Sequence, residues 1–259
     1  MRRKKLRIAA ICVMGLAGLM LASCGVADVV TQAVTEAVQE ATGMAIDEMG
    51  GGPVVTLGYG NMANNEGLYV SLVNNAVSVQ THTSSEIRID FSPPTTGRYV
   101  VPDVEFVAAN NRFEVIEPSG NITFGSNYRP GVVRVYLPEN IVAGNLDLRA
   151  TNGAVRIVGN DSHLADFVSI TVVNGIIELR DFSTDDVLAT STNGTINANS
   201  LTAGNLELRT TNGIITARDS AVSGNLVART INGGVTLENV DADMGRADVN
   251  AVNGHVSIR

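Results

Sequence analysis

An Asn-Gly pair recurs six times in the second half of the 259-residue chain, at a nearly constant interval. The pairs are Asn152-Gly153, Asn174-Gly175, Asn193-Gly194, Asn212-Gly213, Asn232-Gly233 and Asn253-Gly254, and successive pairs are 22, 19, 19, 20 and 21 residues apart. A period this regular is typical of a solenoid, in which each repeat forms one coil and covers the core of its neighbour.

Apolar or small residues flank every pair at fixed positions, six and four before the asparagine and two and four after the glycine. Before the pairs they are Leu146, Leu148, Val168, Ile170, Val187, Ala189, Leu206, Leu208, Leu226, Ala228, Ala247 and Val249. After the pairs they are Val155, Ile157, Ile177, Leu179, Ile196, Ala198, Ile215, Ala217, Val235, Leu237, Val256 and Ile258. Because side chains alternate between the two faces of a strand, we expect these residues to share one face and to form the core.

Two folds explain an alternating pattern around Asn-Gly. In a hairpin meander, each pair is a type I′ turn between antiparallel strands. In a single-stranded parallel β-helix with coils of about 20 residues, each residue lies over its counterpart one coil away. A meander does not require equal repeats, whereas a β-helix does. The constant interval, together with 26 glycines and no tryptophan, favours an all-β fold of the parallel β-helix type.

The six pairs are expected to form one corner of each coil. Glycine allows the chain to turn with φ above zero, and stacked asparagines can exchange amide hydrogen bonds along the column. We therefore predict a structural turn ladder made of all six pairs. On the outward face, Arg209 and Arg229 become neighbours, a repulsion that Glu207 is placed to relieve.

The pattern is less regular before Val133. Asn74-Asn75 and Asn110-Asn111 place Asn where later repeats have Gly, and Asn tolerates positive φ well. Pro130-Gly131 stands 20 residues after Asn110 and 22 before Asn152, so consecutive coils are expected there. The predicted β-helix domain covers residues 54–259, with degenerate coils over 54–140, regular coils over 141–259 and an insertion around Ser92 to Pro102.

The first residues form a separate unit. Five basic residues precede an uncharged apolar run from Ile8 to Leu21, as in export signals. The run ends in Leu21-Ala22-Ser23-Cys24, which resembles the lipobox of bacterial lipoproteins, so we predict a signal peptide over residues 1–23 and acylation of Cys24, for example with palmitate. The alternatives are a conventional cleavage site before an ordinary thiol, or an uncleaved anchor. The run is short for a membrane span of roughly 20 residues.

Removal of the signal peptide changes the charge of the chain. It takes away five of the 18 Lys and Arg residues and leaves 13 against 26 Asp and Glu, a net charge near −13. Such a domain should not bind nucleic acid or bare anionic lipid. With Cys24 acylated, no free thiol is left, since Cys12 lies inside the signal. We expect attachment to the extracytoplasmic face of a membrane, inner or outer, through the lipid.

Residues 24–53 are predicted to form a tether. Apolar residues between Val26 and Ala41 follow helical spacing, but the segment lacks the basic polar face of helices that lie on membranes. A short helix that packs on the body, or a partly flexible spacer, is therefore favoured. Gly50-Gly51-Gly52-Pro53 then ends any helix, so the folded domain should begin near Val54.

Tandem phrases of the form L-x-L-x-T-x-N-G-x-I-x-I follow VRVYLPENI, at Val133 to Ile141. They resemble the bacterial putative-adhesin family, a group of envelope proteins with β-strand repeats. The resemblance covers roughly Val54 to Arg259 and is strongest after Val133. It implies a repeat β fold, while the motif contains no catalytic residues.

Carboxylates were the first candidates for chemistry, because some β-helix proteins cleave polysaccharides. Asp147, Glu207 and Asp248 share one outward column, but Ser169, Leu188 and Val227 interrupt it. No pair is set at the separation of about 5 to 9 Å that glycoside hydrolysis requires. No Gly-x-Ser-x-Gly elbow or Gly-rich phosphate loop is present either. We therefore predict no catalytic residues and no enzyme.

Metal ligands were sought among acids and histidines. Asp181, Asp185 and Asp186, with Asp161 and Asp166, offer oxygen ligands for Ca²⁺, but no glycine-aspartate calcium repeat recurs, which favours solvated loop carboxylates. His82, His163 and His255 fall in different predicted coils without HxxxH spacing, which is typical of surface histidines. We expect no metal site and no cofactor.

These observations favour a lipid-anchored envelope protein whose β-helix is a binding or structural module. Its Thr-, Asn- and Arg-rich faces suit an envelope glycan or protein as partner. A carbohydrate-active enzyme and an envelope-stress sensor or accessory protein are the alternatives. The last coil has no obvious cap, so self-association through its open end is also expected.

Overall fold

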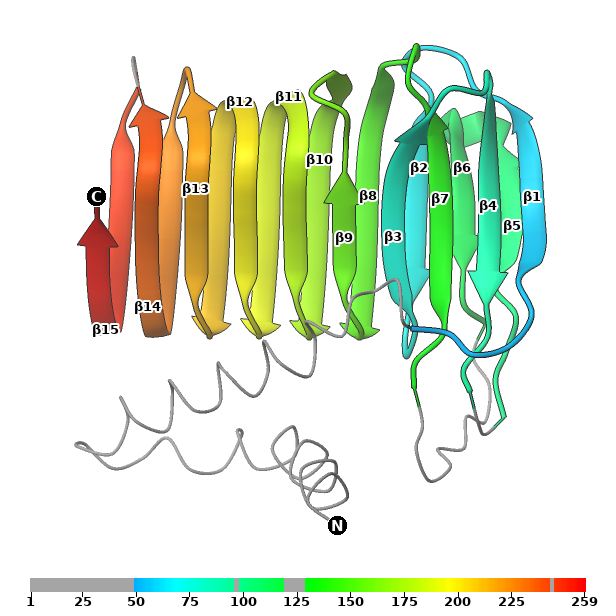
Figure 1. Cartoon of the computed structure of the whole chain (residues 1–259), viewed down its shortest axis with the longest axis horizontal. Coiled ribbons are helices and arrows are strands. Elements are labelled where there is room, and N and C mark those ends of the chain that lie inside the picture. The colour runs from blue at the N-terminus through cyan, green and yellow to red at the C-terminus, as the bar shows by residue number, and fades with distance from the viewer. Residues whose placement is uncertain (1–48, 96–97, 119–128, 243–244) are drawn as a thin grey trace. The chain divides into compact units, whose positions relative to one another are not determined.

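The computed structural model describes residues 49–95, 98–118, 129–242 and 245–259. The predicted signal peptide, Cys24 and most of the predicted tether lie outside these residues. The described chain contains fifteen strands and one short 3-10 helix, and the strands from β8 onward stand side by side as successive rungs (Figure 1). The elements are β1 Val55–Asn61, β2 Gly67–Leu72, β3 Ala76–His82, β4 Glu86–Ser92, β5 Asp103–Val107, η2 Ala108–Asn110, β6 Arg112–Ile116, β7 Val132–Pro138, β8 Ala143–Asn152, β9 Val155–Val158, β10 His163–Asn174, β11 Ile177–Asn193, β12 Ile196–Asn212, β13 Ile215–Val222, β14 Leu226–Ala242 and β15 Ala247–Ile258.

Paired strands from β8 to β15 are parallel, and they are in register apart from one shift between His163 and Ala165 of β10. Leu146 of β8 lies opposite Val168 of β10, and Val168 lies opposite Val187 of β11. Further along, Ile177 lies opposite Ile196, which is 19 positions later in the chain. Paired strands therefore run in the same direction one coil apart. This pairing excludes the hairpin meander and confirms the parallel β-helix.

The core follows the predicted inward positions. In the first five regular coils, the side chains predicted to face inward are at most 3% exposed. In the last coil, Val256 is 42% and Ile258 is 67% exposed. The difference arises because β15 pairs only with β14 among the described strands. The core side chains of each inner coil are thus covered by a coil on either side, whereas those of the last coil are covered by the described strands on one side only.

The coils before β8 are not stacked in the order of the chain. β2 lies between β6 and β8, and β3 lies between β7 and β9, all in parallel pairs. The coil formed by β2 and β3 is therefore the direct neighbour of the regular coils. The coil formed by β6 and β7 lies one step further out. The expectation that Asn110, Pro130 and Asn152 mark consecutive coils is wrong, because the earlier segment, not the adjacent one, pairs with β8 and β9.

Antiparallel strands close the solenoid at this end. β4 pairs antiparallel with both β7 and β1, and β5 pairs antiparallel with β6. Residues 54–140 thus supply two coils and three closing strands rather than degenerate coils throughout. The predicted insertion corresponds to the connection between β4, which ends at Ser92, and β5, which begins at Asp103.

No helix in the described part of the chain is long and apolar enough to cross a bilayer.

Candidate functional site

A ladder of asparagine side chains runs along one corner of the solenoid. Each Nδ2 donates a hydrogen bond of 2.7 to 3.0 Å to the Oδ1 of the asparagine one coil nearer the N-terminal end. The chain of donors passes through Asn253, Asn232, Asn212, Asn193, Asn174 and Asn152, and ends on Asn74. The structure therefore brings all six predicted asparagines together and adds a seventh, Asn74, from a coil 78 residues earlier in the chain.

The glycines of this Asn-Gly corner are required for two reasons, of which the sequence predicts only the first. Gly175 and Gly233 have the expected positive φ, 158° and 147°, a conformation that side chains disfavour, whereas the other four corner glycines do not. A Cβ on Gly194 would instead lie 1.7 Å from the carbonyl oxygen of Gly175 in the next coil. The corresponding approaches at Gly175, Gly213, Gly233 and Gly254 are 1.5 to 1.9 Å, and a Cβ on Gly153 would lie 2.4 Å from the Asn75 carbonyl oxygen. Close stacking of backbones therefore excludes a side chain at all six corners, and positive φ adds to this at two of them.

Five residues with left-handed backbone form a second corner, which was not predicted from the sequence. Asp161, Asp181, Ser200, Asp219 and Asn239 have φ between 47° and 63°. The last four stand seven residues after successive ladder asparagines. Asn239 Nδ2 also donates to Asp219 Oδ1 at 2.7 Å. Asp, Asn and Ser are turn-forming residues, and Asp and Asn in particular tolerate this conformation, so this recurrence was a usable signal.

A third corner, which we call the Gly-Asn corner, is formed in each regular coil by two consecutive residues. In the first four coils these two residues directly follow Ala143, Ala165, Thr184 and Ala203, and the last two coils have them at the equivalent positions. Here Gly144, Gly204, Gly224 and Gly245 stack closely on the backbone of the preceding coil. Asn111 also lies at this corner, where its Nδ2 donates to the Asn65 carbonyl oxygen at 3.1 Å. Its predicted place at the Asn-Gly corner is therefore wrong, although its φ of 49° is positive as expected.

The outward face that leads to the Asn-Gly corner carries alternating charges. Asp147, Glu207 and Asp248 share one column, as predicted, with uncharged residues between them. Each acid pairs with an arginine: Asp147 with Arg149 at 2.8 Å, Glu207 with Arg209, and Asp248 with Arg229. Arg209 and Arg229 are indeed neighbours, and Glu207 contacts Arg209 as expected.

Ion pairing shifts the pKa of three of these residues, Asp248, Arg229 and Arg149. The hydrogen bond from Arg229 holds the pKa of Asp248 below its ordinary value, with further help from the charges of Arg229, Arg246 and Arg209. The same bond raises the pKa of Arg229. In the same way, the hydrogen bond to Asp147 raises the pKa of Arg149. The lowered pKa of Asp248 is the opposite of what a general acid needs, which is a raised pKa.

A shallow groove of about 520 Å³ crosses this face near β15. Its outward lining combines the guanidinium groups of Arg209 and Arg229 with hydroxyl, amide and apolar side chains. The remaining outward residues are Thr190, Thr211, Ile231, Asp248, Asn250 and Val252. Because these residues come from four successive coils, the groove runs across the strands. It offers hydrogen-bond donors at intervals of one coil, about 4.8 Å.

A second hollow, of about 480 Å³, lies at the other end of the solenoid, between β1 and β4. It holds His82, whose Nε2 lies 2.8 Å from the Glu86 carbonyl oxygen. Arg88 is a further lining residue, and its guanidinium stacks 4.4 Å above the centre of the Tyr136 ring. His82 is therefore engaged locally, on β3 and apart from the group that contains His163.

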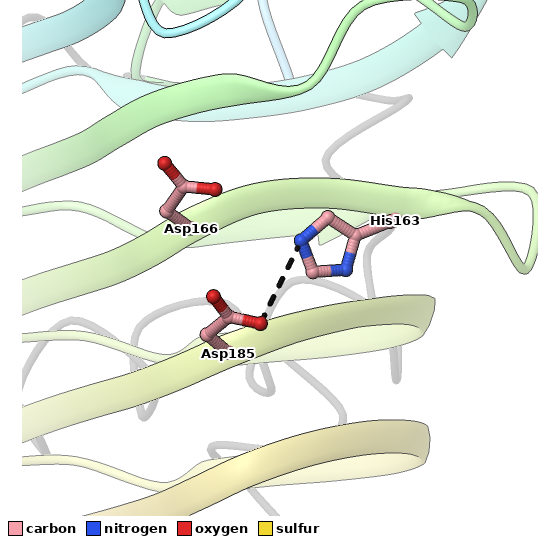
Figure 2. A group of neighbouring side chains, drawn as sticks. All are labelled: His163, Asp166 and Asp185. Atoms are coloured by element: carbon pink, nitrogen blue, oxygen red, sulfur yellow. Dashed lines mark ion pairs between the residues drawn. The ribbon is translucent and has the colours of Figure 1, made fainter.

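Three potential metal ligands meet at the Gly-Asn corner. His163 and Asp166 belong to β10 and Asp185 to β11, and a nitrogen or carboxylate oxygen of each lies within 4.8 Å of the others. Figure 2 shows the three side chains around a common space, with the ring of His163 directed at Asp185. The His163 Nε2 and Asp185 Oδ1 atoms are 3.9 Å apart.

The other acids considered for Ca²⁺ are not part of this group. Asp161 and Asp181 occupy the left-handed corner, and Asp186 Oδ1 accepts a hydrogen bond of 2.6 Å from Asn205 Nδ2. His255 belongs to β15. Only Asp166 and Asp185 thus join a histidine within the described residues. This group was not predicted from the sequence, because His163 and Asp185 come together only through stacking of coils. Cys24 lies outside the described residues.

Comparison with known proteins was made at three levels. The model of the Toastrack DUF4097 family matches residues 66–259, which agrees with the resemblance carried by the β-strand repeats. No curated protein matches the chain.

Three solved structures are similar in fold. A putative cell adhesion protein from Clostridium sporogenes ATCC 15579 is 11% identical, with 80% of this chain and 100% of that chain covered and a TM-score of 0.39. A putative adhesin from Bacteroides fragilis NCTC 9343 is 11% identical, with 80% and 97% covered and a TM-score of 0.45. A putative lipid binding protein from Parabacteroides distasonis ATCC 8503 is 12% identical, with 81% and 98% covered and a TM-score of 0.32.

Proposed function

The chain belongs to the Toastrack DUF4097 family, and on that premise we propose that it is a non-catalytic binding module held by a lipid on the extracytoplasmic face of a bacterial membrane. The observation that carries the binding role is the groove that crosses four coils beside Arg209 and Arg229. Its ligand is an extended polar chain, and an envelope glycan fits best.

The groove suits a glycan for two reasons. Its donors recur at the coil spacing, so a chain of sugar units that lies across the strands meets a hydroxyl, amide or guanidinium at each step. Ile231 is 47% and Val252 is 67% exposed beside these donors, so the groove also offers apolar surface to the carbon face of a sugar ring.

The electrostatics of the groove favour binding over catalysis. Asp248 is its one lining carboxylate, and this carboxylate is bound by Arg229 and lies 3.4 Å from a nitrogen of Arg246. Glycoside hydrolysis requires two carboxyl groups, one of them protonated. The guanidinium groups that remain at the surface are better suited to hydrogen bonds with sugar hydroxyls or with acidic substituents.

Attachment to the membrane depends on Cys24. An acylated cysteine at the mature N-terminus would hold the solenoid at the membrane surface, since each buried CH₂ contributes about 0.8 kcal/mol. Residues 24–53, predicted to form the tether, would connect the solenoid to the lipid. The strongly acidic body supports this arrangement, because it disfavours direct contact with anionic headgroups.

Glycan-array binding of the purified full chain in detergent, with and without Ca²⁺, tests the proposal. We expect binding to one class of extended glycan, and at least tenfold weaker binding by Arg209→Gln and Arg229→Gln variants. Arg218→Gln is the matched control, since Arg218 pairs with Glu238 outside the groove. Equal binding by all three variants would place the ligand elsewhere. Release of new reducing ends from a bound glycan would favour the enzyme instead.

A further inference from the structure

The Gly-Asn corner changes its chemistry at two adjacent coils. The register aligns Gly144, Asp166, Asp185 and Gly204 in one column, and Gly224 and Gly245 continue it. The coils on both sides thus have glycine where these two have aspartate. Two carboxylates therefore stack directly, one coil apart, at about 4.8 Å. Stacked like charges are unfavourable in a sheet, and nothing in the repeat requires them, since glycine serves at this corner elsewhere.

A histidine joins the stacked acids through a local irregularity. β10 and β11 are in register except between His163 and Ala165, where β10 holds one residue more than its partner. Such a bulge re-aims the side chains beside it. His163 points toward Asp185 in Figure 2, and its Nε2 lies 3.9 Å from the carboxylate. The bulge therefore completes a set of one nitrogen and two oxygen donors.

From this arrangement we propose that His163, Asp166 and Asp185 bind one divalent transition-metal ion, with Zn²⁺ as the best fit. Zinc takes His nitrogen and Asp oxygen ligands at about 2.0 to 2.2 Å, so its ligand atoms lie roughly 3 to 3.5 Å apart. The three donors here lie within 4.8 Å of one another. Small rotations of the side chains would bring the donor atoms to the distances that zinc requires. The side chains of His163 and Asp185 are free to make them, since they are 39% and 72% exposed.

The donor set selects the kind of ion. Ca²⁺ prefers six to eight oxygen ligands, and the corner supplies two carboxylates and an imidazole. Asp186, the next carboxylate, is held by Asn205. Glycine at Gly144 and Gly204 leaves the column uncovered on both sides, so the ion has access from solvent. Three protein ligands leave one position of a tetrahedral zinc ion to water.

The bound ion joins two coils. His163 and Asp166 lie on β10, and Asp185 lies on β11. Coordination therefore links two neighbouring coils and removes the repulsion between the stacked carboxylates. Zinc binding and the removal of one carboxylate should therefore each increase the stability of the fold, but only the wild-type protein should respond to zinc. Zn²⁺ stabilises the wild-type protein, whereas Asp185→Asn stabilises the metal-free protein and loses the response to Zn²⁺.

Isothermal titration of the full chain, without a polyhistidine tag and after treatment with EDTA, measures the site with ZnCl₂ alone. We expect one equivalent bound by the wild-type protein, and affinity reduced about tenfold or more in His163→Ala and Asp185→Asn. His255→Ala and Asp186→Asn remove the same groups outside the site and should bind as the wild type does. Thermal unfolding with and without Zn²⁺ shows that the variants fold.

Two results would overturn the site. The first is a wild-type protein that binds no saturating equivalent of Zn²⁺. The second is a His163→Ala variant that binds Zn²⁺ with wild-type stoichiometry and affinity while folded. A visible absorption band of bound Co²⁺ that is lost in His163→Ala, and kept in His255→Ala, would support coordination by this imidazole.

Discussion

The corners of neighbouring coils approach so closely that a Cβ on Gly175 would lie 1.9 Å from the carbonyl oxygen of Gly153. The same contact recurs at Gly194, Gly213, Gly233 and Gly254. Beside it, the asparagine side chains are hydrogen-bonded from coil to coil. The repeated Asn-Gly phrase is thus a device for stacking, in which glycine provides the space and asparagine the bond.

The first prediction concerns the glycine contact. Gly194→Ala should destabilise the protein by about 1–3 kcal/mol or more, because its new methyl group meets backbone that cannot move without separating two coils. Gly234→Ala is the control, since its methyl group would meet only the His255 side chain, at 3.0 Å. Urea unfolding followed by circular dichroism measures both. Equal midpoints for the two variants would contradict the stacking explanation.

The ladder itself is tested at Asn193, which donates to Asn174 and accepts from Asn212, both at 2.8 Å. Asn193→Ala should cost about 1–3 kcal/mol, the sum of two net hydrogen bonds. Thr192→Ala changes an exposed neighbour without touching the ladder and should have little effect. A loss of stability no larger in Asn193→Ala than in Thr192→Ala would show that the ladder contributes nothing.

The Asp248–Arg229 pair predicts a pH dependence. The pKa of Asp248 is lowered in the folded protein by its hydrogen bond from Arg229, so the unfolded chain takes up this proton first as the pH falls. Stability from the pair is therefore present above about pH 4, the ordinary aspartate pKa, and is lost as the pH falls through the lower folded value. Asp248→Asn should be less stable than the wild type at pH 7, and the gap should narrow in acid. A gap that stays constant or widens in urea unfolding would argue against the pair.

Lipidation is tested at Cys24. A Cys24→Ser variant expressed in a bacterial host should lose its acyl mass in intact-protein mass spectrometry and move from the membrane to the soluble fraction. Cys12→Ala lies in the apolar run of the signal and should leave the acyl mass unchanged. Retention of the membrane-bound form by Cys24→Ser would favour an uncleaved anchor.

Self-association is predicted at β15, which carries exposed Val252, Val256 and Ile258 beside backbone groups that no described strand covers. Such an edge pairs readily with another strand. Light scattering of the full chain in detergent should show an increase in mass with protein concentration. Val256→Lys combined with Ile258→Lys should abolish the increase, because charged residues on an edge oppose pairing. A strict monomer at high wild-type concentration would disprove it.

Local periodicity determined much of this protein in advance. The interval between asparagines set the coil length, and the alternation around Leu206 and Ile215 identified the core, since both positions are fully buried. The stacked asparagines and the pairing of Glu207 with Arg209 could be anticipated because they join residues at the repeat distance or on the same strand. The positive φ of Gly175 and Gly233 was also predicted, but the close stacking at all six corner glycines was not, because the sequence does not reveal how closely two backbones approach.

Only the tertiary structure decided which distant segments meet. β3 pairs with β9, and Asn74 bonds to Asn152, although a nearer segment carries Pro130-Gly131 at the repeat distance. His163 reaches Asp185 because a bulge in β10 shifts its register. In consecutive coils, the repeat specifies which residues stack on one another, since stacked residues are separated by a nearly constant number of positions in the sequence. At the irregular end, several edges can accept the same strand, and the packing of the whole core selects one.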